Sequence, residues 1–445
     1  MSDQTALTYT KVNQDVISML DKPTIKWLAL FLPVLGFVGF GLFCFTYQVY
    51  TGLGVAGYRH PVFWGVYITD FVFWVGIAHS GTLISAILYL FRAKFRVSIY
   101  RIAEAMTVFA VLTAGLFPII HLGRPWFFYW LFPYPNQREL WVNFKSPLLW
   151  DVFAVSTYLT VSSVFFFVGM IPDIAAIRDK VVEVPRKIAY SILSLGWKGS
   201  NWEWLHYSRA YLYFAAFATP LVLSVHSVVS WDFAMADLPG WHTTIFAPYF
   251  VAGAIFSGLG MVITLTIPIR KIFALEDYIT LDNYDGMAKM ILLTSLIVGY
   301  AYGCEFFMAW YSGSPAEWGQ FYYRATGQYA LFYWIMVVCN VVMPLPLWFK
   351  SVRRNIKALF IISIFINIGM WFERFNIIVI SLSQGFEPGA WGIYKVSWVE
   401  MGITIGSFAW FFMFFLIFIK TLPAISIAEL KEILPVPKKE AKHHG

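Results

Sequence analysis

The chain has 445 residues, of which 59% are apolar, 20% are aromatic and only 13% are charged. A soluble domain carries about 25% charged residues, so this composition excludes a soluble globular protein. The net charge of +7 comes from lysines and arginines between and beyond apolar stretches, as in membrane proteins, and gives no reason to expect nucleic-acid binding.

Ten apolar stretches of membrane-spanning length follow one another along the chain. About 20 apolar residues in a helix cross a bilayer core of about 30 Å, and backbone groups in lipid must be satisfied within the segment. The alternating pattern of a β-barrel is not seen. We therefore predict an all-α polytopic membrane protein with spans at about 27–50, 65–91, 97–121, 148–171, 209–230, 243–269, 287–312, 328–349, 358–382 and 395–420.

The segments outside the spans are short. Residues 1–26 form a polar leader, and the first span is too long for a removable signal peptide, so we expect it to be retained. No Pro/Ser-rich linker interrupts residues 27–426, which we predict to be a single transmembrane domain. Residues 427–445 form a charged tail.

Basic residues fix the expected orientation. Most of the 32 lysines and arginines lie in the leader, in alternate connections and in the tail, for example Arg92, Lys94 and Arg101 in the connection after the second span. Few, such as Arg324, fall in the other connections. Since positive loops face the cytoplasm, we predict that both termini are cytoplasmic.

The third span closes with His121 and, thirty residues later, Asp151 opens the fourth. Buried ionisable groups are costly in a membrane and mark functional sites. Both residues are predicted at the outer face, where we expect them to pair. The loop 122–147 between them is rich in aromatic residues and proline, which fits either a partner-docking surface or an aromatic belt.

Other buried ionisable residues have competing explanations. Asp70 and His79 point to opposite faces of one helix, so we do not expect them to pair. Asp232 and Glu400 are expected to cap helix N-termini, and His226 could simply bind a backbone carbonyl.

The inner half of the spans, apart from His79, is expected to hold mainly Asn340, Asn367, serine and threonine. A complete transmembrane proton path is therefore not predicted from charged residues alone.

Quinol oxidation is the chemistry that fits the outer residues. A quinol needs an apolar pocket and a base near each hydroxyl, and histidine supplies a base with a pKa near neutrality. Cys44, Cys304 and Cys339 form no C-x-x-C pair, so we expect no iron–sulfur cluster or covalent haem in this chain. Haem b is not expected, because its axial ligands must face each other and His79, His121 and His226 are predicted at different depths. We also expect no metal site.

The string His121-Leu122-Gly123-Arg124-Pro125-Trp126, with Ser146-Pro147 and Trp150-Asp151, resembles the NrfD/polysulfide-reductase membrane subunit family. The ten-span layout and the string Trp371-Phe372-Glu373-Arg374-Phe375-Asn376 are most similar to the larger NrfD-like subunit of bacterial alternative complex III. The similarity extends over essentially the whole chain.

The resemblance implies two four-helix bundles, spans 2–5 and 6–9, flanked by spans 1 and 10. It implies a subunit of the bacterial inner membrane that oxidises menaquinol or ubiquinol at the periplasmic face. Electrons would pass to a docked iron–sulfur subunit, then to multihaem cytochrome c subunits and a terminal oxidase, beside a second NrfD-like subunit and lipids. The implied quinol site is His121, Asp151, Arg124 and Asp70; the implied proton-path residues are Asp70, His79, His226, Glu305, Glu373 and Arg374.

Three alternatives stay open. Within the family, the chain could be the quinone-site anchor of a molybdopterin reductase of the polysulfide-reductase type. Intramembrane acids also mark ion paths, so a secondary transporter or proton channel is a second alternative. The third is a purely structural anchor, whose outer acids cap helices and bind nothing.

Overall fold

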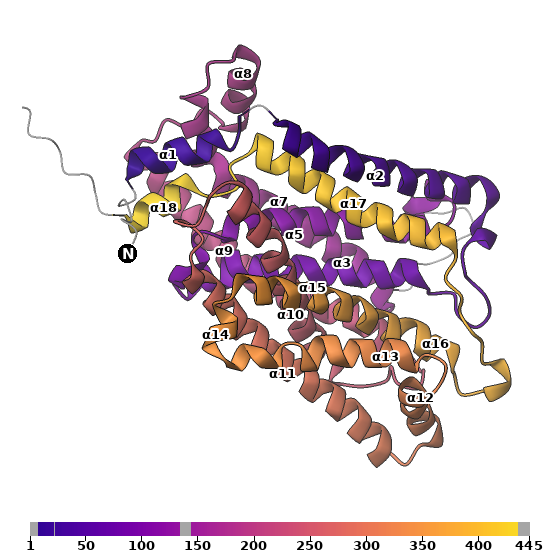
Figure 1. Ribbon diagram of the computed structural model, residues 1–445. Helices are drawn as coiled ribbons and strands as arrows, with labels where there is room; N and C mark the ends of the chain where they lie inside the picture. The colour runs from indigo at the N-terminus through magenta and orange to yellow at the C-terminus, as the bar shows by residue number, and fades with distance from the viewer. Residues whose placement is uncertain (1–7, 22, 134–143, 435–445) are drawn as a thin grey trace, which may run out of the picture.

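The computed structural model describes residues 8–21, 23–133 and 144–434, and the regular elements in these residues are all helical. Ten of the helical segments are long and apolar enough to cross a membrane (Figure 1), which confirms the predicted fold class. They are α2 (Ile25–Thr51), Val66–Leu90, Tyr100–His121, α7 (Pro147–Arg178), α9 (Asn201–Ala234), α10 (Phe246–Ile272), α11 (Leu281–Tyr311), Ala330–Trp348, Ile356–Ser383 and α17 (Trp398–Thr421).

Four of the spans are built from more than one helical element. The second joins α3 (Val66–Thr82), the π-helical turn η2 (Leu83–Ile87) and α4 (Leu88–Leu90), and the third joins α5 (Tyr100–Ala114) and α6 (Leu116–His121). The eighth joins α13 (Ala330–Val337), the π-helical turn η5 (Val338–Val342) and η6 (Leu345–Trp348). The ninth joins α15 (Ile356–Phe375), the π-helical turn η7 (Asn376–Ile380) and α16 (Ser381–Ser383). Turns of this kind are frequent at functional sites.

Shorter helices lie before, between and after the spans. They are α1 (Tyr9–Ser18), η1 (Leu53–Val55), η3 (Lys94–Arg96), η4 (Pro125–Leu131), α8 (Val184–Leu193), α12 (Pro315–Thr326), α14 (Lys350–Arg353), η8 (Pro388–Ala390) and α18 (Ile427–Ile433). The first seven residues of the predicted tail are therefore helical. The leader residues 1–7, the loop residues 134–143 and the tail residues 435–445 lie outside the described residues.

Local sequence signals explain where several helices begin. Ser397 and Glu400 form a capping box at the start of α17, so the predicted capping role of Glu400 is confirmed. Ser200 and Glu203 form the same motif at the start of α9. Proline occupies the first turn of α7 and of α12, where its missing N–H costs no hydrogen bond.

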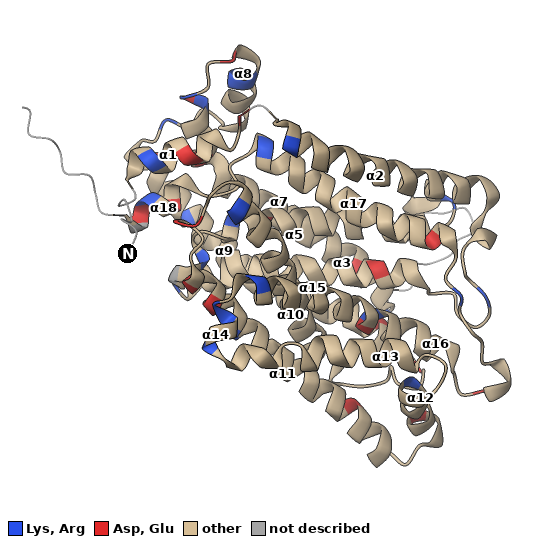
Figure 2. Ribbon diagram, in the orientation of Figure 1, with Lys and Arg blue, Asp and Glu red and all other residues tan. Residues whose placement is uncertain are grey.

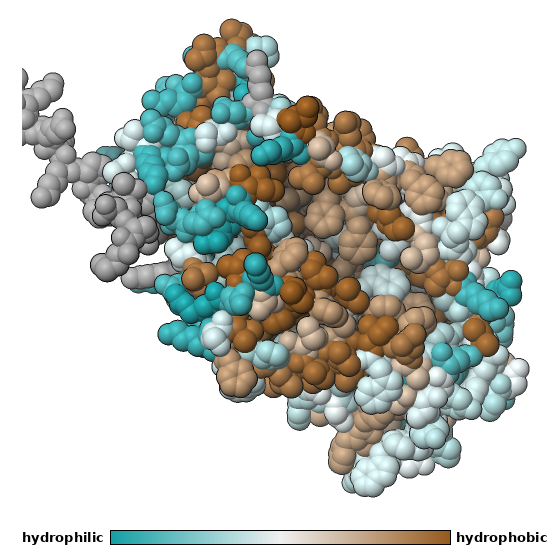
Figure 3. All heavy atoms as spheres, in the orientation of Figure 1, coloured by the Kyte–Doolittle hydropathy of each residue, from teal (hydrophilic) through white to brown (hydrophobic). Residues whose placement is uncertain are grey.

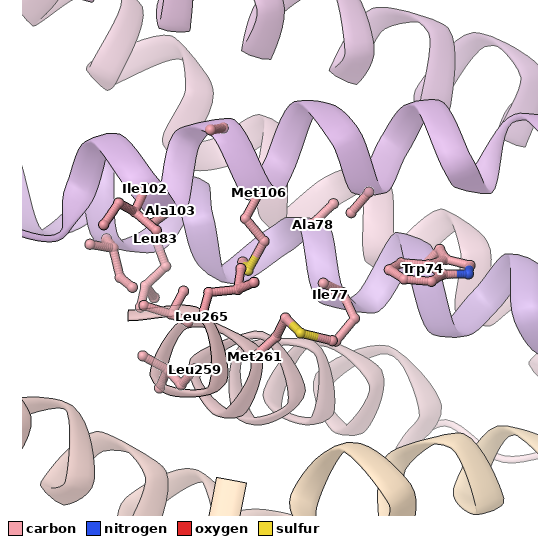
Figure 4. Packing of buried hydrophobic residues seen from close by; sticks show 14 of the residues in the cluster. Trp74, Ile77, Ala78, Leu83, Ile102, Ala103, Met106, Leu259, Met261 and Leu265 are labelled. Carbon is pink, nitrogen blue, oxygen red and sulfur yellow. The ribbon is translucent and has the colours of Figure 1, made fainter. Parts of the chain in front are cut away.

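The helix α3 is the centre of the molecule. Within its span, 94% of the most apolar window is buried, against 11% for α2. Figure 4 shows why: Ile77 and Ala78 of α3 face Met106 of α5 on one side and Met261 of α10 on the other. The polar side chains that α3 carries are therefore held inside protein and not against lipid.

The helices α2 and α17 run side by side along one edge (Figure 1). Their backbones approach closely because the contact residues are small: a Cβ atom added to Gly406 would lie 2.6 Å from the Cα atom of Gly41. This places the first and last spans together at the periphery. The grouping of the other spans into two four-helix bundles stays a prediction.

Charged residues gather at one end of the helices, which we call the basic end (Figure 2). The helices α1, α8, α14 and α18 lie there, and α1 and α18 are joined by a hydrogen bond of 2.9 Å from Tyr9 Oη to the carbonyl of Lys431. Figure 3 shows an apolar belt beside this charged cap. The opposite end, which carries His121, we call the His121 end. That the basic end faces the cytoplasm stays a prediction.

Candidate functional site

His121 is held at the end of α6 by a tyrosine that the sequence did not single out. Tyr58, in the connection after the first span, has its hydroxyl oxygen 2.9 Å from Nδ1 of His121. The two rings meet edge to face with centroids 5.5 Å apart. The imidazole is half-buried. Among the described residues, His121 makes its side-chain hydrogen bond through Nδ1, which leaves Nε2 for a bound molecule.

The residues after His121 form a tight turn at the same end. Gly123 has a φ of +70°, and a Cβ atom there would overlap the side chain of Leu53, so both the backbone and the space require glycine. Arg124 is exposed. Trp126 and Trp130 of η4 are also exposed, as expected of a partner-docking surface and equally of an aromatic belt.

Asp151 contacts a second carboxyl group. It lies one turn into α7 with 6% of its surface exposed, and its carboxyl meets that of Asp232 on α9. Within the described part of the chain, neither oxygen of Asp151 accepts a hydrogen bond from a donor group. Two buried carboxylates in contact cannot both be ionised, so this pair is suited to holding one proton.

The predicted role of Asp232 is wrong. It lies in the last turn of α9 and not at a helix N-terminus. The helix dipole disfavours a negative charge at this C-terminal position. The expected pairing of His121 with Asp151 is also not seen: among the residues described, no hydrogen bond or ion pair joins them. His121 belongs with Tyr58, and Asp151 belongs with Asp232.

Asp70 is fully buried near the same end of α3 and makes two side-chain hydrogen bonds. Nε1 of Trp371 donates to Oδ1 at 2.7 Å, and Oγ1 of Thr404 donates to Oδ2 at 2.6 Å. Asp70 therefore ties α3 to α15 and α17. As predicted, it does not pair with His79.

The structure brings His79 and His226 together in the middle of the helices. Their ring centroids are 4.5 Å apart, and Tyr158 stacks on His79 at 4.9 Å. His79 Nδ1 contacts the carbonyl of Val75, whereas Nε2 of His79 and both nitrogens of His226 have no partner among the described residues. The prediction of different depths for these two histidines is therefore wrong, as is the backbone-carbonyl explanation of His226. The rings touch, which leaves no space for a porphyrin between them.

Glu373 and Arg374 connect this pair to the second half of the chain. Nη1 of Arg374 lies 3.1 Å from Oε1 of Glu373, and its guanidinium covers the ring of Phe250, which also contacts His226. Glu373 accepts hydrogen bonds from Tyr302 and, at 3.4 Å, from Asn340. Both charged residues are less than 2% exposed. Each has found a partner on another span.

Glu305 lines a small, partly enclosed cavity at the His121 end of α11. The cavity measures about 10 Å³, room for one water molecule. Arg324 of α12, in the connection between the seventh and eighth spans, also lines the cavity and is only 3% exposed. Oε1 of Glu305 has no partner among the described side chains, so the cavity offers a polar site for water.

The prediction that the inner half of the spans, nearer the basic end, carries almost no charged residues is wrong. Arg101 is part of α5 and not of a connection, and it is 1% exposed, next to Glu104 and Asp173. Hydropathy windows hid these residues because long apolar neighbours outweigh them. In the part of the chain that the structure describes, no group of three or more His, Cys, Asp or Glu residues could hold a metal ion.

Comparisons with known proteins agree on one family. The family model described as "Polysulphide reductase, NrfD" matches residues 54–384. A putative membrane subunit of dimethyl sulfoxide reductase from Halobacterium salinarum is 25% identical over 425 residues, which cover 89% of this chain and 91% of that protein. A selenate reductase subunit from Mesobacillus selenatarsenatis is 22% identical over 175 residues, 39% of each chain.

Proposed function

Because the chain belongs to the NrfD/polysulphide reductase family, we propose that it is the quinone-binding membrane subunit of a molybdopterin-type reductase. Quinol gives its electrons to an iron–sulfur subunit docked at the His121 end, and they are consumed at a molybdenum centre in a further partner. The resemblance to alternative complex III favours multihaem cytochromes and a second NrfD-like subunit instead. The names of the two relatives fit the reductase better.

The observation that carries the proposal is the setting of His121. Tyr58 occupies Nδ1, so Nε2 is the nitrogen that meets a quinol hydroxyl. A positioned histidine takes that proton as a general base. Exposed aromatic residues of η4 beside it provide an apolar wall for the ring and a surface for the partner.

Oxidation of one quinol releases two protons and two electrons. The electrons leave to the partner's iron–sulfur cluster, and His121 receives the first proton. Asp151 is the candidate for the second, since no donor group among the described residues occupies its oxygens. Asp70 is less suited, because Trp371 and Thr404 already donate to both of its oxygens.

His121→Ala tests the site in the intact complex, purified through a tag on this chain. We expect quinol-dependent reduction of the acceptor to fall by about 100-fold or more, the usual contribution of a general base. The matched control is His60→Ala, an exposed histidine in the same connection as Tyr58, which should leave the rate unchanged. Asp151→Asn, measured alongside, separates the two proton acceptors.

Equal rates for His121→Ala and the unsubstituted complex would contradict the site. The metal content of the same preparation tests the type of complex. Molybdenum together with non-haem iron supports the reductase, whereas multiple c-type haems without molybdenum support alternative complex III.

A second proposal concerns proton movement. His79 and His226 are in contact, and three of their ring nitrogens have no partner among the described residues, which favours a role for them in carrying protons between the two ends. Further buried polar residues lie on the His121 side of this histidine pair, namely Glu373, Arg374 and Glu305. A transporter or channel is the rival explanation; proton flux through the isolated chain without quinol would favour it.

A further inference from the structure

Five charged side chains lie buried together at the basic end, where α5, α7, η3 and α18 meet. They are Arg96, Arg101, Glu104, Asp173 and Glu429, and we call them the ionic cluster. Each is less than one-tenth exposed. Burying ions costs several kcal/mol apiece unless each is paired, so the pairing within the cluster decides its charge.

Two of the three carboxylates are paired closely. Nη2 of Arg101 donates to Oδ2 of Asp173 at 3.0 Å, and the backbone N–H of Ala428 donates to Oδ1 at 2.9 Å. Nη2 of Arg96 donates to Oε2 of Glu429 at 2.7 Å. The helix α18 thus contributes to both pairs and covers the cluster.

Glu104 is the third carboxyl group, and its ion pair is the longest of the three. Its Oε2 atom lies 3.4 Å from Nη1 of Arg101. The shorter hydrogen bonds of this guanidinium are made by Nη2, to Asp173 and, at 2.7 Å, to the carbonyl of Gly169. Its Oε1 atom accepts a hydrogen bond of 3.1 Å from the hydroxyl of Tyr211. That neutral donor does not compensate a charge.

The charges therefore do not balance. Two guanidinium groups face three carboxyl groups, and the tyrosines that complete the cluster, Tyr100, Tyr207 and Tyr211, are neutral. Lys431 and Glu432 stand at the less buried rim of α18 with opposite charges that offset each other. One extra positive charge is needed inside, and a proton is the smallest ion that can supply it.

We propose that the ionic cluster binds one proton and that Glu104 holds it. Glu104 has the weakest ion pair and can donate or accept toward Tyr211 in its neutral form. Thr107 follows one turn later on α5 and, like Tyr158, donates to the carbonyl of Ala78. Tyr158 stacks on His79, so polar groups follow one another from Glu104 toward the middle of the helices. The proposal is independent of quinone chemistry.

Infrared spectroscopy of the full-length chain in nanodiscs tests for the proton. With glutamate carboxyl groups labelled with ¹³C, we expect the spectrum to lose one protonated-carboxyl band in Glu104→Gln at neutral pH. Arg96→Leu should add a band, because it removes one compensating charge. The control Glu387→Gln removes an exposed glutamate and should leave these bands unchanged. An unaltered spectrum in Glu104→Gln would show that the cluster is fully ionised or binds a metal cation, and would overturn the proposal.

Thermal unfolding of the same samples locates the proton. Glutamine has the shape and charge of a protonated glutamate, so Glu104→Gln should keep the unfolding temperature of the unsubstituted chain. Asp173→Asn and Glu429→Gln each break a close ion pair and should lower it clearly. If Glu429→Gln were the harmless variant and Glu104→Gln the damaging one, the proton would belong to Glu429 and the assignment to Glu104 would be wrong.

Discussion

Tyr58 supplies the polar contact that orients His121. Burial raises the pKa of Tyr58, so its hydroxyl stays protonated and can donate to Nδ1. Its ring is supported edge to face by Tyr67 at 5.9 Å. Tyr67 itself donates to Gln48, which in turn donates to the carbonyl of Ile120 at 3.1 Å. Two tyrosines therefore lie side by side, and only one of them touches the histidine.

That difference gives a matched pair of variants. Tyr58→Phe removes one hydrogen bond to His121, worth about 1 kcal/mol, and should lower the quinol-dependent kcat by about fivefold. KM should change little, because the apolar wall around the quinol stays. The measurement is steady-state quinol oxidation by the purified complex.

The control is Tyr67→Phe, which removes a hydroxyl of the same kind from Gln48 and leaves His121 bonded. It should retain nearly the full kcat. Equal losses in the two variants would mean that the tyrosines act only through packing, and Tyr58 would lose its positioning role.

The candidate residues His121 and Asp151 could be singled out from the sequence by their type, but their contact partners could not. His121 and Asp151 stand out because a titratable group is costly near lipid, and depth follows from 1.5 Å per residue. Depth does not give the direction in which a side chain points around its helix. The partners Tyr58 and Asp232 follow from that direction and from helix packing, so they emerge only in three dimensions.

At the scale of elements, glycine determines how the first and last spans meet. Gly402 and Gly406 stand one turn apart on α17 and face Cys44 and Gly41 of α2. Small residues let helix backbones approach closely in a membrane, where packing must replace the hydrophobic effect. Since α2 has few other buried residues, this contact holds it in place.

Gly406→Leu should therefore detach α2 from α17. The added side chain overlaps the backbone of Gly41, and overpacking of this kind costs about 1–3 kcal/mol. Cys44, now fully buried, should react with a thiol reagent many times faster. The rate of labelling in detergent or nanodiscs, in a Cys304→Ser and Cys339→Ser background, measures the effect.

Gly36→Leu is the matched control, because it lies on α2 with open space around it. Its labelling rate should equal that of the unsubstituted background. Slow labelling in Gly406→Leu would show that α2 is held by contacts other than the glycines.

The fold was easier to predict than the site. All ten spans follow from apolar length, since a lipid-facing segment of this kind satisfies its backbone groups only as a helix. The ends of the spans were less accurate: α9 begins at Asn201, eight residues before the predicted start at 209. A capping box of Ser200 and Glu203 and several aromatic residues extend it, and hydropathy averages over such local signals.

At the scale of the whole molecule, buried polar groups lie at three levels. The ionic cluster occupies the basic end, His79 and His226 the middle, and Asp70, Glu305 and the Asp151–Asp232 pair the His121 end. The hydroxyls of Thr107 and Tyr158 lie between the first two levels. Burying so many polar groups is costly, which favours a use for them beyond holding helices together.

His226→Leu tests whether the middle level carries protons. Neither ring nitrogen has a partner in the described residues, so an apolar side chain of similar size removes only a desolvated polar group and the fold should persist. In proteoliposomes that contain the intact complex, quinol oxidation should continue while the number of protons moved per electron falls. We expect this fall because leucine, beside His79, can neither bind a proton nor release one. An unchanged proton-to-electron ratio, at an unchanged rate of quinol oxidation, would assign His226 a purely structural place and leave proton release to the His121 end alone.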